Sequence, residues 1–315
     1  MSGPVDEFSA VSPDLGVSAI EVREGRSAKV GRMGVLRVLP TKGRRTVGPW
    51  CFADLIRPDD IAEPPPLEIG PHPHIGLATA TWLFRGTALH SDSLGTEQLI
   101  RPGELNLMTA GRGIAHAELG VETATGVGAD GIMGVQMWLA QTDATRQGAS
   151  RFEHLGELPV ADLASDGRAH VIVGEIAGES SSARVDHPTI GLDVTFDARV
   201  EVPADPRFEY GVVPVDRPVR VEDAIVEPGS LALVPTGYER LVLETPGATA
   251  RLLLLGGEPL GVEIKMWWNF VARTLDEMTD AWRAWRAHDD DRFGPVPSKL
   301  ARIEAPTPPW LPPSS

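Results

Sequence analysis

The stretch RPGELNL at residues 101–107, followed by Gly111, recurs as EPGSLAL at residues 227–233, followed by Gly237. Pro, Gly, two leucines and the later glycine keep the same mutual spacing in both copies. Pro-Gly favours a tight turn, and alternate leucines then point to one face of the next strand. The repeat predicts two related halves built from β-strands, with chance matching of common turn residues as the alternative.

Short apolar runs separated by turn residues extend this pattern along the chain. Glycine and proline account for 33 and 28 of the 315 residues, and they separate runs such as residues 35–39, 105–108 and 251–255. Short strands with frequent turns favour a β-sandwich or β-barrel over alternating strands and helices. The predicted fold class is therefore all-β.

One segment near the C-terminus is predicted to form a short α-helix. Thr274 can cap its first turn, and Glu277, three residues later, completes a capping box. Apolar residues then recur at helical spacing, and we expect them to pack on one buried face. These residues are Leu275, Met278, Trp282 and Trp285.

The chain is predicted to contain two barrels in tandem. We expect the first barrel over residues 16–140 and a connection over residues 141–155, which is rich in polar and small residues. The second barrel, with the C-terminal helix, is expected over residues 156–294. Residues 1–15 and the proline-rich residues 295–315 are expected to be extended or flexible termini.

Charge and composition exclude several classes of protein. The formal net charge of −15 repels nucleic-acid phosphates and anionic lipid surfaces, so neither nucleic acid nor membrane is an expected partner. The single cysteine, Cys51, lies in an apolar run and is predicted to be buried; one cysteine allows neither an intrachain disulfide nor a thiolate-rich metal site. The acidic N-terminal segment lacks the pattern of a secretory signal, so we expect a cytoplasmic protein.

Two short motifs carry the predicted chemistry. His72 and His74 form one i, i+2 pair, and His116 and Glu118 form another. Residues i and i+2 of a strand project from the same face, so two such strands facing one interior bring together three imidazoles and a carboxylate. This donor set suits one divalent ion and leaves two octahedral positions open. Because an isolated His-x-His motif also occurs by chance, the prediction depends on both pairs being present.

The remaining histidines are predicted to have other roles. His90 lies near a turn between the two motifs, where Asp92 is a good turn former, so we expect it to be structural or to support a ligand. The others lack nearby partners in the sequence and are interpreted as surface or packing residues. They are His154, His170, His187 and His288.

At these motifs the sequence resembles the pirin family. The resemblance is carried by three ordered stretches, at residues 71–74, 86–95 and 108–118. Further similar segments lie at residues 39–49, 135–139 and 266–271, so the likeness covers nearly the whole chain.

The resemblance implies a bicupin, with two double-stranded β-helix (jelly-roll) barrels, and a metal in the N-terminal barrel only. It implies His72, His74, His116 and Glu118 as ligands and iron (Fe2+) as the usual metal; nickel, copper, manganese or zinc also fits the donor set. When Pro102 is aligned with Pro228, Val242 and Glu244 occupy the positions of His116 and Glu118, so we expect no metal in the second barrel. Ala78 stands where many pirins carry a glutamate, which leaves Glu118 as the obvious acid/base.

Three functions are consistent with this site. Bacterial pirins resemble quercetin 2,3-dioxygenases, which implies an iron-dependent oxygenase acting on a flavonol-like aromatic substrate, with Glu118 as the catalytic base. Animal pirins resemble redox-sensing regulators, which implies a metal-dependent surface for a protein partner without turnover. In the third, the metal serves only to stabilise the fold.

Overall fold

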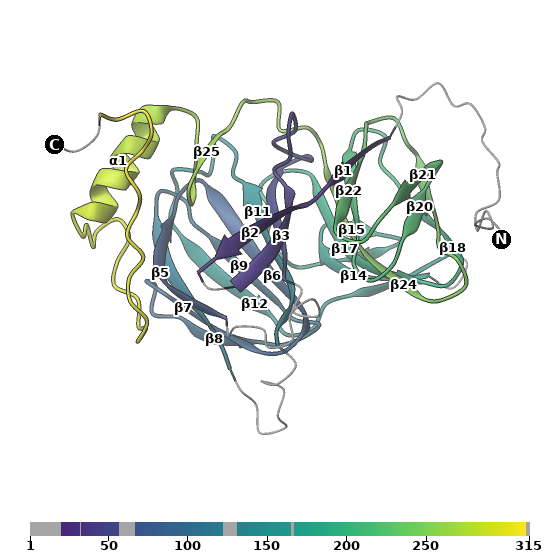
Figure 1. Cartoon of the computed structure of the whole chain (residues 1–315), viewed down its shortest axis with the longest axis horizontal. Helices are drawn as coiled ribbons and strands as arrows, with labels where there is room; N and C mark the ends of the chain where they lie inside the picture. The colour runs from purple at the N-terminus through teal and green to yellow at the C-terminus, as the bar shows by residue number, and fades with distance from the viewer. Residues whose placement is uncertain (1–19, 32, 57–66, 122–130, 165–166, 313–315) are drawn as a thin grey trace, which may run out of the picture. The chain divides into compact units, whose positions relative to one another are not determined.

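The computed structural model describes residues 20–31, 33–56, 67–121, 131–164 and 167–312. These residues are mostly β-strand, with one α-helix among them (Figure 1). No helix in the described part of the chain is long and apolar enough to cross a membrane. The predicted extended segment at residues 1–15 lies outside the described residues. The chain divides into two compact units, and each is described separately below.

The first barrel comprises the described residues within 27–36, 53–157 and 260–312. Its strands form a seven-stranded sheet, a four-stranded sheet and a two-stranded sheet. The strand pairs whose register is known are antiparallel. The seven strands are, in order, β12 (Arg151–Leu155), β9 (Leu105–Thr109), β6 (Leu77–Arg85), β11 (Met133–Ala140), β4 (Trp50–Ile56), β3 (Met33–Leu39) and β2 (Arg26–Val30). The four are β5 (Glu68–His74), β10 (Ile114–Gly120), β7 (Ala88–Asp92) and β8 (Glu97–Ile100), and the two are β25 (Lys265–Trp267) and β26 (Phe270–Ala272).

The second barrel comprises residues 158–259 with the described residues up to Arg26 and residues 37–52. It too has one seven-stranded and one four-stranded sheet, so the two related β halves predicted from the repeat are confirmed. The seven strands are β1 (Glu21–Glu24), β22 (Ser230–Val234), β19 (Glu209–Pro214), β24 (Ala250–Gly257), β17 (Thr189–Phe196), β14 (Gly167–Val173) and β13 (Val160–Leu163). The four are β18 (Arg199–Pro203), β23 (Arg240–Glu244), β20 (Val219–Val221) and β21 (Ala224–Val226); β15 (Glu175–Ile176) and β16 (Glu179–Ser180) form a separate pair.

Strand β23 differs from the expected alignment by one residue. Leu241 and Leu243 are fully buried in the aliphatic core of the second barrel, whereas Val242 and Glu244 are only partly buried. Glu244 pairs instead with Arg199. The connection before β23 therefore changes the side-chain phase, because a shift of one residue moves a strand's side chains to the other face. Val242 and Glu244 do not occupy the inward positions of His116 and Glu118.

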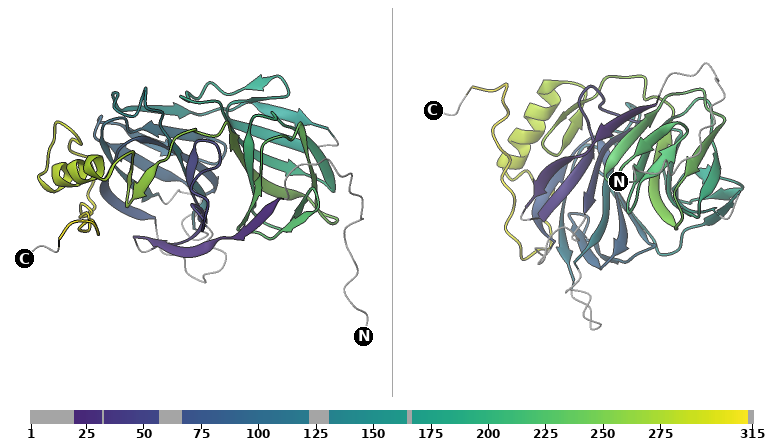
Figure 2. Two further views of the ribbon diagram at one scale, coloured as in Figure 1. Left: turned by 90° about the horizontal axis from the view of Figure 1, so that it is seen from above. Right: turned by 45° about the vertical axis from the view of Figure 1, so that its right-hand side comes forward.

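Helix α1 (Leu275–Arg286) confirms the predicted cap and corrects its place in the fold. The hydroxyl of Thr274 accepts a hydrogen bond from the backbone N–H of Glu277 at 3.2 Å. Met278, Trp282 and Trp285 are buried as expected, but Leu275 is 42% exposed. The buried face packs in a cluster with Ile75 and Phe270 of the first barrel, so the helix does not belong to residues 156–294 as predicted. Figure 2 shows the helix beside the strands of that barrel.

The predicted connection and the C-terminal segment are also parts of the first barrel. Residues 151–155 of the expected connection form β12, which pairs with β9. The described residues 295–312 contain no helix or strand, yet they pack on the barrel: the N–H of Ile303 donates to the carbonyl of Pro71 at 2.8 Å. The indole of Trp310 donates to the hydroxyl of Thr279 on α1 at 2.9 Å.

A β-bulge in β5 explains why its sequence contains Gly70-Pro71. His116 of β10 pairs with His72, but Glu118 pairs with Ile69, so β5 contains one extra residue at this point. Proline is tolerated in a bulge because the missing N–H is not needed there. Gly70 is required because a Cβ atom at this position would lie 1.9 Å from the carbonyl oxygen of Ala301.

We predict that Gly70→Ala lowers the free energy of unfolding by about 1–3 kcal/mol, the usual cost of overpacking a filled site. Urea unfolding of the metal-free protein measures this change. Gly156→Ala is the matched control, because a Cβ atom there meets only the ring of His154 at 3.7 Å. Equal stability of the two variants would show that the C-terminal segment does not restrain β5.

Candidate metal centre

The predicted histidines meet because β5 and β10 are neighbours in the four-stranded sheet. His72 lies directly opposite His116 in the antiparallel register, and His74 projects from the same face of β5 as His72. All three side chains are buried, with exposed fractions of 7%, 1% and 1% for His72, His74 and His116. The i, i+2 spacing in the sequence therefore predicted their convergence correctly.

The three imidazoles are close enough to share one ion. One ligand nitrogen from each lies within 4.8 Å of the others. The Nε2 atoms of His74 and His116 are 3.0 Å apart. Two imidazole nitrogens bound at right angles to one divalent ion are separated by about 3 Å, given metal–nitrogen distances of about 2.1 Å. This pair thus has the spacing of two adjacent ligands.

Burial keeps these imidazoles neutral. The pKa of His72 is lowered from 6.5 to about 4, chiefly because burial removes water from the charged form. Burial, and then the neighbouring histidines, hold the pKa values of His74 and His116 well below 6.5. Neutral imidazoles at pH 7 have a nitrogen lone pair free for a metal.

Backbone carbonyls determine which nitrogen of His72 and His74 is available. Nδ1 of His72 donates to the carbonyl of Gly70 at 2.9 Å, and Nδ1 of His74 donates to the carbonyl of Asn269 at 3.1 Å. A neutral imidazole that donates through Nδ1 has its lone pair on Nε2. The Nε2 atoms of these two residues are therefore acceptors with no proton of their own, and a cation shared with His116 satisfies them. The donor set fits a divalent metal.

Glu118 lies on the same face of β10 as His116 but is not part of the group within 4.8 Å. Its carboxyl is buried, with 8% exposure, and hydrogen-bonds to the side chain of Thr81 on β6. Burial raises the pKa of this carboxyl above 4.5, and the opposing effects of His90 and Thr81 are smaller. Glu118 as a fourth ligand stays a prediction.

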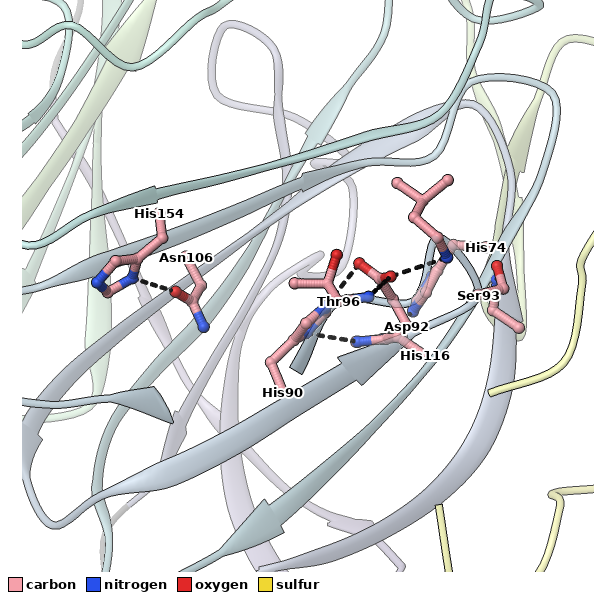
Figure 3. A network of polar contacts seen from close by, with 10 residues as sticks. His74, His90, Asp92, Ser93, Thr96, Asn106, His116 and His154 are labelled. Atoms are coloured by element: carbon pink, nitrogen blue, oxygen red, sulfur yellow. Dashed lines mark hydrogen bonds and ion pairs between the residues drawn. The ribbon is translucent and has the colours of Figure 1, made fainter. Parts of the chain in front are cut away.

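Several residues around the histidines were not identified from the sequence as part of this site. The ring of Trp138 packs edge-on against His74, with centroids 5.2 Å apart. Phe152 of β12 stacks on His90, with centroids 4.5 Å apart, and His90 in turn contacts His116 (Figure 3). These aromatic contacts come from strands far apart in sequence, so no local motif signals them. The sequence also does not predict the contact of His74 with the carbonyl of Asn269, because a backbone carbonyl is present in every residue type.

Two other residues considered in the sequence lie outside the group of three histidines. His154, expected to be a surface or packing residue, donates a hydrogen bond from Nδ1 to the side-chain oxygen of Asn106 at 2.8 Å. Ala78 is buried, but it lies on the opposite face of β6 from Thr79 and Thr81, since its register with β9 is unbroken. A residue at position 78 therefore does not point toward Glu118.

Comparisons with known proteins identify the family. The family model for pirin matches residues 32–139, and the model for the pirin C-terminal cupin domain matches residues 191–293. This chain belongs to the pirin family. Both barrels of this pirin are cupin barrels, so the predicted all-β fold with a short C-terminal helix is confirmed.

Three similar proteins place this pirin more closely. A provisionally assigned quercetin 2,3-dioxygenase of Pseudomonas aeruginosa is 40% identical over 291 residues, which are 90% of this chain and 89% of that protein. The crystal structure of a quercetin 2,3-dioxygenase from Acinetobacter baumannii is 38% identical, with a TM-score of 0.84 over 94% of this chain and 97% of the other. A pirin of Escherichia coli, solved in complex with nickel(II), is 15% identical, with a TM-score of 0.57 over 76% of this chain and 100% of that one, and shares the fold.

We predict that His74→Ala and His116→Ala each abolish stoichiometric metal binding at neutral pH, because each removes one of the two closest nitrogens. The loss should exceed the 10- to 100-fold typical of residues that only support a ligand. Metal analysis after gel filtration and calorimetric titration with zinc measure it. The control is His154→Ala, which removes an imidazole outside the group and should bind zinc as tightly as the unaltered protein does. Equal zinc binding by all three variants would contradict the assignment of His74 and His116 as ligands.

We also predict that the metal-free protein loses stability as the pH falls from 6.5 toward 4. The lowered pKa values of the three histidines mean that the unfolded chain binds more protons than the folded chain in this window, so acid favours unfolding. The raised pKa of Glu118 has the opposite effect, because at this carboxyl the folded chain binds more protons than the unfolded chain. Three histidines act against this one carboxyl, so we expect a net loss of stability in acid.

Urea unfolding with a chelator at pH 7 and pH 5 tests this dependence. The triple variant His72→Asn, His74→Asn, His116→Asn has no titrating ligand and should lose most of the difference. An unchanged pH dependence in the triple variant would show that other groups cause it.

Proposed function

We propose that this pirin is a metal-dependent dioxygenase that opens the heterocycle of a flavonol of the quercetin type. The observation that carries the proposal is the buried group of three neutral imidazoles. The chain is also 40% identical to a provisionally assigned quercetin 2,3-dioxygenase and 38% identical to a quercetin 2,3-dioxygenase of known structure, over most of each length. Three protein nitrogens leave coordination positions open, as a catalytic rather than a purely structural site requires.

We propose iron as the metal, as the family resemblance implies. Nickel, copper, manganese and zinc also accept imidazole and carboxylate donors, so loading with each is part of the test. When bound, the metal would supply Lewis acidity that lowers the pKa of a flavonol 3-hydroxyl group and redox chemistry for dioxygen.

The chain's own residues would bind the substrate and move one proton. The indole of Trp138 packs against His74 and the ring of Phe152 against His90, and these apolar rings would line the position of a flat aromatic substrate. A carboxylate oxygen of Glu118 would accept the proton of the 3-hydroxyl group, and the raised pKa of this carboxyl makes it a stronger base than an exposed glutamate. The side chain of Thr81 holds this carboxyl in place.

The test is to load the protein anaerobically with iron(II) or nickel(II), add quercetin under air, and follow the visible absorption band together with oxygen uptake. We expect both to fall in proportion to bound metal. A flavone without the 3-hydroxyl group should not react. Rates no higher than those of His74→Ala, in the presence of the same metal, would overturn the proposal and favour a role in which metal state controls a protein partner.

We predict that Glu118→Gln lowers kcat by about 100-fold or more per bound metal, because general-base catalysis typically contributes 10²–10⁴. Metal content is measured on the same samples, so that loss of metal is separated from loss of the base. An unchanged kcat at equal metal content would exclude Glu118 as the proton acceptor.

A further inference from the structure

His116 differs from the other two histidines in the partner of its Nδ1 atom. His72 and His74 contact backbone carbonyls, whereas Nδ1 of His116 lies 3.4 Å from Nδ1 of His90. Nε2 of His90 lies in turn 3.1 Å from Oδ2 of Asp92. These contacts form a row that runs from His74 through His116 and His90 to Asp92, and Figure 3 shows the four side chains close together. The pairing of β10 with β7 builds the row, because His116 lies opposite Asp92 in the register.

Asp92 is a fixed acceptor at the end of this row. Its side chain is fully buried, and Oδ1 accepts hydrogen bonds from the backbone N–H groups of Leu94 at 2.9 Å and Thr96 at 3.1 Å. Burial by itself raises the pKa of this carboxyl, but the hydrogen bonds from His90 and the two N–H groups outweigh it, so the pKa is lowered. The side chain is therefore an ionised acceptor that donates no proton.

His90 is held in one orientation between its two partners. Its ring stacks on Phe152 with an interplanar angle of 20°. Because Asp92 can only accept, Nε2 of His90 carries the proton that it donates. A neutral His90 then has its lone pair on Nδ1 and accepts the proton on Nδ1 of His116. His116 is left with its lone pair on Nε2, which lies 3.0 Å from Nε2 of His74.

We propose that His90 and Asp92 are positioning residues that hold His116 in the tautomer with Nε2 available to the metal. The inference rests on the proposed metal site and does not depend on what the metal does there. Neither residue touches the ion; the carboxylate acts through His90, and His90 acts through His116. Partners of this kind typically change metal affinity 10- to 100-fold.

Asp92→Asn tests the direction of the hydrogen bonds. The Leu94 and Thr96 N–H groups need an acceptor, so the amide oxygen should take the place of Oδ1 and the amide NH₂ should face His90. An NH₂ group donates, which reverses each bond and places a proton on Nε2 of His116. We expect zinc affinity to fall about 10- to 100-fold while the fold is retained.

His90→Asn and His90→Leu form a matched pair of nearly equal shape. The amide oxygen of asparagine can accept from Nδ1 of His116, whereas leucine cannot. We expect His90→Asn to bind zinc at least about 10-fold more tightly than His90→Leu. A role in packing alone predicts equal binding or an advantage for leucine. His154→Asn and His154→Leu are the control pair and should differ by less than about twofold, because His154 bonds to Asn106 rather than to His116.

The experiment measures zinc dissociation constants at pH 7.5, with the melting temperature of each metal-free variant, and nitrogen NMR of labelled histidine to identify the protonated atom of His116. The double variant His90→Asn, Asp92→Asn should show no added loss from Asp92→Asn, since Asp92 acts through His90. Equal affinities across the series would overturn the positioning role and leave the proposed oxygenase intact. The expected series without quercetin turnover would overturn only the oxygenase. A wild-type protein that binds neither zinc nor iron(II) would overturn both.

Discussion

The antiparallel register of β10 against β5 and β7 is the constraint on which the metal centre depends. It sets His116 opposite His72 on one side and opposite Asp92 on the other. A slip of one residue would turn every side chain of β10 to the other face and disperse the group. The bulge at Gly70 and Pro71 is part of the same constraint. It shifts the register of β5 against β10 at the point between His116 and Glu118, and it positions the carbonyl that accepts the hydrogen bond from Nδ1 of His72.

This arrangement opposes stability when no cation is present. Burial lowers the pKa values of the three imidazoles and raises the pKa of Glu118, because it removes the water that would stabilise the charged form of each group. The inward positions of the second barrel carry aliphatic side chains instead, such as Leu241, Leu243 and Val200. The two barrels thus share one sheet arrangement but differ in what their interiors contain, and polar groups gathered in one interior are typical of a functional site.

The sequence could predict those features that depend on local spacing. The His-x-His and His-x-Glu pairs follow from the period of a strand, and the cap at Thr274 follows from residues one turn apart. What it could not show depends on long-range packing. Helix α1 belongs to the first barrel because its buried face packs on Ile75 and Phe270, which the helix sequence does not reveal. The inward phase of β23 depends on the path of the preceding connection, so an alignment from Pro228 placed Val242 and Glu244 one residue out.

The three imidazoles also differ in how firmly the fold specifies them. His72 and His74 donate to the backbone carbonyls of Gly70 and Asn269, so neither depends on a partner side chain. His116 depends on the side chains of His90 and Asp92, which a single substitution can change. Variation at positions 90 and 92 could therefore alter the electron donation and affinity of one ligand without moving the other two. In this chain the backbone N–H groups of Leu94 and Thr96 anchor the Asp92 carboxylate, so the fold fixes the acceptor on which His116 depends through His90.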